Sequence, residues 1–194
     1  MSFDTFSDLN VMKSVPEKKR PQPIKIKIRT KSSSSITDIQ NISPLSKYDS
    51  NPSLIIEADG VKIFLGTYGD SKDLKFIERE NIGSIVCVMK EKPYFQDTIK
   101  EINFLHIPVD DLCSEKISDY FEIFNNFIDE NIKNKRNIFV HCLMGISRSP
   151  SFVISYLIVK RNMIFKEAYK FVKSKRGQIE PNMGFQLLLE SLKN

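Results

Sequence analysis

The chain has 194 residues, of which 41% are hydrophobic and 27% charged, a balance that excludes a chain disordered throughout. No apolar run approaches the roughly 18 residues that a membrane-spanning helix needs, so we expect no membrane partner. The three cysteines are widely spaced and cannot form a disulfide framework. A reducing compartment is therefore expected, cytoplasmic or nuclear or both.

The net charge of +5 is unevenly distributed, because residues 1–50 hold nine basic and five acidic side chains. The rest of the chain is close to neutral, which argues against a nucleic-acid-binding face and predicts no nucleic-acid partner. Residues 1–50 also hold four prolines and a serine run without a steady apolar period. We therefore expect a disordered basic tail over 1–52 and a folded domain over 53–194.

From residue 53 onward the apolar pattern alternates between strand and helix periods. In chain order the predicted elements are strands over 53–57 and 61–65, a helix over 70–81, strands over 84–89 and 102–109, a helix over 117–132, a strand over 137–140, and helices over 149–161, 165–172 and 185–192. Asp59-Gly60 between the first two apolar runs is typical of a hairpin. The helix over 70–81 is expected to bury Leu74 and Ile77 and to end near Gly83. Mixed strands and helices predict an α/β fold with helices on a central sheet.

The segment Val140–Ser149, Val-His-Cys-Leu-Met-Gly-Ile-Ser-Arg-Ser, joins the last predicted strand to a long apolar helix. Loop amides and a helix N-terminus converge at such a junction and attract an anion. Gly145 permits the tight turn that this loop needs, and Arg148 offers a planar fork for two phosphoryl oxygens. These positive groups favour the thiolate of Cys142, which is a nucleophile for phosphoryl transfer.

Each residue alone has a simpler interpretation. A lone cysteine after a strand is usually a small core residue, and a lone arginine near a helix start is usually solvated. The combination of Cys142, Gly145, Arg148 and Ser149 at a strand–helix junction favours the phosphate-binding interpretation.

This segment resembles the His-Cys-x5-Arg-Ser/Thr signature of the cysteine-based protein tyrosine phosphatases, and its Gly-x-Ser-Arg-Ser part resembles the dual-specificity branch. The segments 61–66, 107–111 and 181–185 are similar to an early strand, an acid loop and a final helix start of that family. The resemblance covers about residues 53–194. It implies a mixed, mostly parallel sheet of about five strands flanked by helices, and a phosphatase catalytic domain over 53–194.

The resemblance also implies roles for residues of the loop. Cys142 would attack phosphorus and form a phosphocysteine, Arg148 would clamp the phosphoryl oxygens, and Ser149 would donate a hydrogen bond to the sulfur. His141 would orient the loop and support the thiolate, although a satisfied histidine at a buried strand end is an equal alternative. The expected substrate-binding positions are Leu143, Met144, Gly145, Ile146, Ser147 and Arg148.

The reaction also needs a general acid for the leaving oxygen. The resemblance implies that Asp111 supplies it, with the adjacent Asp110 as the alternative. No metal or other cofactor is expected, since His106 and His141 stand alone without metal-ligand spacing.

The variable loop positions are apolar or neutral. Relatives that act on inositol polyphosphates or RNA triphosphates place cationic or otherwise diagnostic groups there, so the resemblance implies a phosphoprotein substrate, with both phosphotyrosine and phosphoserine or phosphothreonine accepted. A phosphatase acting on a phosphoinositide, RNA or glucan is the enzymatic alternative, and a non-catalytic phosphate-binding module is the other.

The tail segment from Lys18 to Ile26 places a basic cluster before alternating isoleucines. It resembles the docking motif that MAP kinases bind, so a MAP kinase is a candidate partner. A solvated basic linker and a nuclear-import signal are alternatives for the same residues.

Overall fold

A computed structural model describes residues 51–92 and 102–192. The strands are β1 (Ser53–Ala58), β2 (Val61–Gly66), β3 (Ile82–Val88), β4 (Asn103–Ile107) and β5 (Asn137–His141). The helices are η4 (Asp70–Lys72), α1 (Leu74–Arg79), η6 (Ile117–Tyr120), α2 (Phe121–Lys133), α3 (Arg148–Arg161), α4 (Phe165–Lys175) and α5 (Met183–Ser191). The predicted tail, with its Lys18–Ile26 segment, lies almost entirely outside the described residues.

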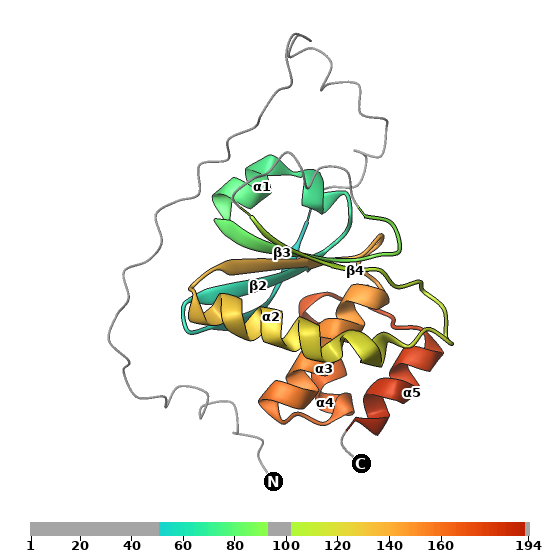
Figure 1. The fold of residues 1–194 in the computed structure, drawn as a ribbon. Helices are drawn as coiled ribbons and strands as arrows, with labels where there is room; N and C mark the ends of the chain where they lie inside the picture. Colours follow the sequence, from blue (N-terminus) through green and yellow to red (C-terminus); the bar gives the residue numbers. More distant parts are fainter. Residues whose placement is uncertain (1–50, 93–101, 193–194) are drawn as a thin grey trace.

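The five strands form one sheet in the order β1-β2-β5-β3-β4, with β1 antiparallel to β2 and the other pairs parallel. Helix α1 covers one face of the sheet, and α2 to α5 cover the other (Figure 1). The predicted fold class, a mixed and mostly parallel sheet of about five strands flanked by helices, is confirmed. None of the helices in the described part of the chain is long and apolar enough to cross a membrane.

Alternation along the central strands builds a core on each face, because successive side chains of a strand point to opposite sides. In β5, Ile138 and Val140 pack toward α2–α5, whereas Phe139 between them packs toward α1. On the α1 side, Phe76 meets Phe64 and Phe139 edge to face, with ring centroids 5.4 and 5.3 Å apart. The central strands are therefore buried on both faces, as their apolar sequence predicts.

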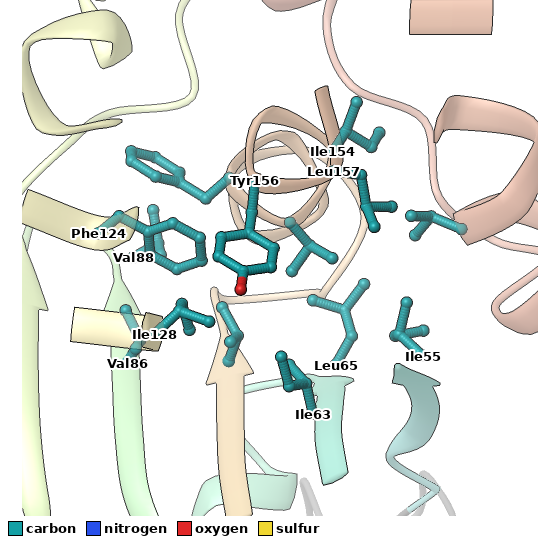
Figure 2. Close-up of a cluster of buried hydrophobic side chains, with 14 of the residues drawn as sticks. Ile55, Ile63, Leu65, Val86, Val88, Phe124, Ile128, Ile154, Tyr156 and Leu157 are labelled. Atoms are coloured by element: carbon teal, nitrogen blue, oxygen red, sulfur yellow. The ribbon is translucent and has the colours of Figure 1, made fainter. Parts of the chain in front are cut away.

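Helix α3 lies at the centre of the larger core. Its residues Ile154, Tyr156 and Leu157 are all buried; Tyr156 points toward the sheet, whereas Ile154 lies on the side of α3 away from the strands (Figure 2). The same core cluster includes the labelled side chains Ile55, Ile63, Leu65, Val86, Val88, Phe124 and Ile128 from the sheet and α2. Helix α3 is buried from Ser149 to Ile158, as expected for a helix that is apolar on nearly all sides, and this packing anchors its N-terminus beneath the loop 142–147.

The hairpin between β1 and β2 is confirmed, with Asp59 and Gly60 at positive φ values of 53° and 74° in its turn. The single helix predicted over 70–81 is wrong. A short 3-10 turn ends at Asp73, whose extended backbone (ψ 91°) and side chain cap a new helix by accepting from the Lys75 and Phe76 amides. Aspartate competes for backbone donors in this way and favours caps over helix interiors.

The end of that helix also differs from the prediction. Asn81 takes a positive φ of 48° and ends α1, so β3 begins at Ile82 and Gly83 lies inside the strand. Phe76 and Ile77 are the buried residues of α1, whereas Leu74 is only half-buried. The later start of α1 changes which side chains face the sheet.

Candidate active site

The carboxyl ends of the four parallel strands meet at one edge of the sheet, where ligands bind in open α/β sheets. The loop 142–147 leaves this edge after β5 and enters α3 at Arg148. Cys142 at its base is only 1% exposed, and its Sγ accepts a hydrogen bond from the Gly145 amide at 3.2 Å. Gly145 has a φ of 64°, and a Cβ there would lie 2.5 Å from the Gly66 carbonyl oxygen. Glycine is therefore needed to bring this amide to the sulfur.

Three carbonyl groups of the loop are held by donors from other parts of the fold. The pairs are the Tyr68 amide to the Leu143 oxygen (3.1 Å), Arg176 Nε to the Gly145 oxygen (3.1 Å) and the Glu180 amide to the Ile146 oxygen (2.7 Å). The described part of the chain has no cis peptide bond, and in a planar trans peptide the C=O and the following N–H point in opposite directions. The amides of Met144, Ile146 and Ser147 therefore point away from these outer donors, toward the loop interior. This is the arrangement of an anion-binding nest.

Arg148 places its guanidinium beside this nest. The side chain is 12% exposed, and its Nη1 donates to the Val109 carbonyl oxygen at 3.4 Å. Its Nε lies 3.6 Å from Asp111 Oδ2, an ion pair that is too long for a hydrogen bond. The guanidinium therefore lies between the loop and Asp111 and keeps Nε available for an anion.

Asp111 is brought to the loop by two further contacts. Its Oδ1 accepts from Ser147 Oγ at 2.6 Å and from Asn182 Nδ2 at 2.9 Å. The backbone N–H of Asn182 in turn donates to Ser147 Oγ at 3.1 Å. Ser147, predicted as a substrate-binding position, thus contacts the candidate acid, and the side chains of Ser147, Asp111 and Asn182 together with the Asn182 backbone amide form one closed network.

The neighbouring Asp110 points elsewhere. Its carboxylate pairs with Lys90 Nζ at 2.9 Å on the surface, and this hydrogen bond raises the pKa of Lys90. Of the two candidate acids, only Asp111 lies beside Arg148.

His141 is fully buried, and its ring stacks with those of Tyr68 and Phe139, whose centroids are 6.1 and 5.6 Å away. Burial lowers its pKa to about 4. The imidazole is therefore neutral near pH 7, and its Nδ1 contacts the Cys142 carbonyl oxygen at 3.4 Å. Any support that His141 gives to the sulfur comes through shape and hydrogen bonding, because a neutral ring brings no positive charge.

Ser149 is completely buried in the first turn of α3, and its Oγ has no hydrogen-bond partner among the described residues. The hydrogen bond expected from Ser149 to the sulfur is not formed in this structure, where the Gly145 amide occupies that role. The remaining loop positions differ in exposure: Leu143 and Met144 are 49% and 52% exposed, and Ile146 is half-buried.

Four residues of the site were missed by the sequence analysis: Tyr68, Arg176, Glu180 and Asn182. Asn182 carried a signal, since Pro-Asn before an apolar run is typical of a helix cap, and its Oδ1 does accept from the Phe185 amide. Its second contact, to Asp111 at a separation of 71 residues, carried none. Tyr68 and Glu180 act through backbone amides, which leave no residue-type signal.

Across residues 51–92 and 102–192, no three His, Cys, Asp or Glu side chains are grouped so that they could hold a metal ion.

Comparison with known proteins places this geometry in a family. Residues 63–194 match the family model described as "Dual specificity phosphatase, catalytic domain". The human dual specificity protein phosphatase 6 is 36% identical over 143 residues, which is 74% of this chain and 37% of that protein. The MAP kinase phosphatase with leucine-rich repeats protein 1 of Dictyostelium discoideum is 34% identical over 134 residues, 69% of this chain and 15% of that protein. The chain thus spans little more than a third, or less, of these curated relatives.

Solved structures agree on the fold. DUSP15 superposes with a TM-score of 0.66 at 29% identity, covering 72% of this chain and 85% of that one. The human tyrosine phosphatase-like serine/threonine/tyrosine-interacting protein gives a TM-score of 0.65 at 29% identity, covering 72% of this chain and 93% of that one.

Proposed function

Because the chain belongs to the dual specificity phosphatase catalytic domain family, we propose that it is a protein phosphatase that works through a phosphocysteine intermediate. The observation that carries the proposal is the loop 142–147. One amide of this loop donates to the Cys142 sulfur, and three others are turned inward by carbonyls held from outside. This cradle suits a phosphoryl group placed directly above a nucleophilic sulfur.

In the first step the Cys142 thiolate attacks phosphorus. An S–P bond forms, and the bond from phosphorus to the substrate oxygen breaks. Arg148 and the loop amides hold the equatorial oxygens, whose charge grows in the transition state. Asp111 gives its proton to the leaving oxygen, so no alkoxide or phenoxide is released.

In the second step Asp111, now a carboxylate, takes a proton from water as the water attacks phosphorus. The S–P bond breaks, inorganic phosphate leaves, and the Cys142 thiolate is restored. Ser147 and Asn182 support this cycle by keeping the Asp111 carboxyl group at the loop in both protonation states. Arg148 turns from its long contact with Asp111 to the bound phosphoryl group.

The proposed substrate is a phosphoprotein. The exposed loop side chains are Leu143 and Met144, which are uncharged. A cradle with neutral walls suits a single phosphate on a side chain better than a polyphosphate. Relatives are named dual specificity and MAP kinase phosphatases. We extend the proposal to phosphotyrosine together with phosphoserine or phosphothreonine, and to a MAP kinase as the partner.

The test is turnover of aryl phosphates by the full chain. Cys142→Ser is expected to abolish turnover while binding of orthovanadate persists. Asp111→Asn is expected to lower turnover of phenyl phosphate by about 10²–10⁴-fold. The loss should be smaller for p-nitrophenyl phosphate, whose leaving group needs less protonation.

Asp110→Asn is the matched control, since it changes the same charge one residue away, where the carboxylate faces Lys90. It should retain near-normal turnover of both substrates. Turnover by Cys142→Ser would refute the proposed nucleophile. A wild-type chain that binds a phosphopeptide without hydrolysing it would favour the non-catalytic alternative.

A further inference from the structure

Arg176 is a buried cation that holds one loop carbonyl from outside and takes no part in the bond-making steps of the proposed reaction. It follows the last residue of α4, is 5% exposed, and has no carboxylate within 4 Å among the described residues. Burial lowers its pKa, whereas the negative charges of Asp70 and Cys142 raise it. Burying a charge without an ion pair costs stability, so the contacts that this guanidinium makes need an explanation.

The guanidinium joins two distant parts of the chain. Its Nε donates to the Gly145 carbonyl oxygen at 3.1 Å. Its Nη1 donates to the Asn51 carbonyl oxygen and to Ser53 Oγ, each at 3.3 Å. Arginine presents these donors in a rigid planar fork, so the position of one partner constrains the other.

The partner in the loop is the peptide group between Gly145 and Ile146. Since its C=O is held by Arg176, its N–H points the opposite way, toward the loop interior. The same residue, Gly145, donates its own amide to the Cys142 sulfur. The space behind the loop is filled, because a Cβ on Gly145 would lie 2.8 Å from Arg176 Nη2.

We propose that Arg176 is a positioning residue: one buried guanidinium holds the Gly145–Ile146 peptide in its phosphate-binding orientation and fastens it to the start of β1. This inference rests on the proposed function, since it concerns how the phosphate loop is kept in shape. It adds that the first residues of the folded domain, Asn51 and Ser53, here called the entry, are linked to that loop through Arg176. A change at this entry therefore alters phosphate affinity without touching the substrate.

The experiment compares orthovanadate inhibition, kinetics with p-nitrophenyl phosphate and thermal unfolding in the full chain. Arg176→Met is expected to weaken vanadate inhibition at least tenfold and to lower kcat/KM by a similar factor. Arg176→Lys keeps the positive charge but reaches only one of the two partners, so its loss should be intermediate. Lys175→Met is the matched control, because it removes the same charge from an exposed neighbour, and it should change neither constant.

Ser53→Ala removes one link at the entry and leaves the loop, Arg176 and the sulfur unaltered. It should weaken vanadate inhibition two- to fourfold with little change in melting temperature, and it decides the proposal if Arg176→Met does not fold. A purely structural Arg176 would lower the melting temperature of Arg176→Lys and leave its vanadate inhibition equal to wild type, which would overturn the proposal.

Vanadate inhibition of Ser53→Ala equal to that of the wild type would overturn the proposed link between the loop and the entry. Failure of the proposed function looks different, because the wild-type chain itself would then neither bind vanadate nor turn over the aryl phosphate.

Discussion

Gly145 combines a positive φ of 64° with a backbone approach that leaves no room for a side chain. The amide on one side of this residue reaches the sulfur, and the carbonyl on the other side reaches Arg176. A single residue thus sets the orientation of two successive peptide groups in the loop.

We predict that Gly145→Ala lowers kcat/KM for an aryl phosphate by about 10²-fold, the effect typical of losing one preorganised donor. The added methyl group collides with the Gly66 carbonyl and moves the amide away from Cys142. Gly177→Ala is the control, since a Cβ at Gly177 meets no atom within 4 Å. Similar kinetics for the two variants would contradict this account of the loop.

His141 makes the stability of the fold depend on pH. Its pKa is lowered by burial from 6.5 to about 4. Between these two values the unfolded chain binds a proton that the folded chain does not, so the free energy of unfolding falls as the pH falls. The contribution is complete above pH 6.5, and its loss approaches about 3 kcal/mol below pH 4.

We therefore predict that His141→Gln flattens the pH dependence of stability between pH 4 and 6.5, whatever it does to stability at pH 7. Urea unfolding of wild type and variant at half-unit intervals measures this difference. His106→Gln changes the other histidine of the chain and serves as the control. Parallel wild-type and His141→Gln curves over this window would refute the prediction.

At the scale of elements, α3 links the core to the site. Its first turn follows the loop 142–147, and its second turn is held by aromatic contacts. The Phe152 ring meets Phe121 and Phe124 edge to face, with centroids 5.3 Å away in both pairs. The N-terminus of α3 is therefore held in place by the packing of Phe152 in the second turn of the helix.

We predict that Phe152→Ala lowers the free energy of unfolding by about 3–5 kcal/mol, because Phe152 is fully buried and its removal leaves a cavity. Ile123→Ala on α2, at a position 52% exposed, should change it by no more than about 0.5 kcal/mol. Urea denaturation measures both. A cost for Phe152→Ala as small as that of the control would show that α3 is not anchored there.

At the scale of the whole molecule, the sheet order brings the ends of β2, β5, β3 and β4 to one edge. The Tyr68 amide, which precedes β3, and the Arg176 side chain and Glu180 amide, which follow α4, all donate to carbonyls of the loop 142–147 there. The segment of this chain that is proposed to bind a kinase, Lys18–Ile26, lies in the N-terminal tail and is separate in sequence from the candidate catalytic residues.

We predict that deleting residues 1–30 weakens binding of a purified MAP kinase and leaves turnover of p-nitrophenyl phosphate unchanged, since Asn51 and Ser53 are retained. Calorimetric titration and steady-state kinetics on the same preparations measure the two effects. Replacing Lys18, Lys19 and Arg20 by alanine in the full chain should reproduce most of the binding loss if the basic cluster is the docking element. Equal affinity of the truncated and full chains would exclude docking through this segment.

Local sequence patterns were sufficient to predict much of the secondary structure of this protein. Strand and helix periods predicted the central strands, the hairpin and the buried α3. The order of Cys142, Gly145 and Arg148 was sufficient to predict a tight loop between a strand and a helix start, because these three features act over a few consecutive residues. The break at Asp73 was missed, since one side chain capping two amides outweighs the apolar period around it.

Tertiary structure alone decided which distant groups complete the site. Ser147 and Asp111 are 36 residues apart, Gly145 and Arg176 are 31 apart, and Arg176 and Asn51 are 125 apart. The choice between Asp110 and Asp111 as the residue beside Arg148 depends on which way each side chain leaves one short loop. Backbone donors such as the Tyr68 and Glu180 amides are present at every non-proline residue. Only the packing of the chain determines which of them face the loop.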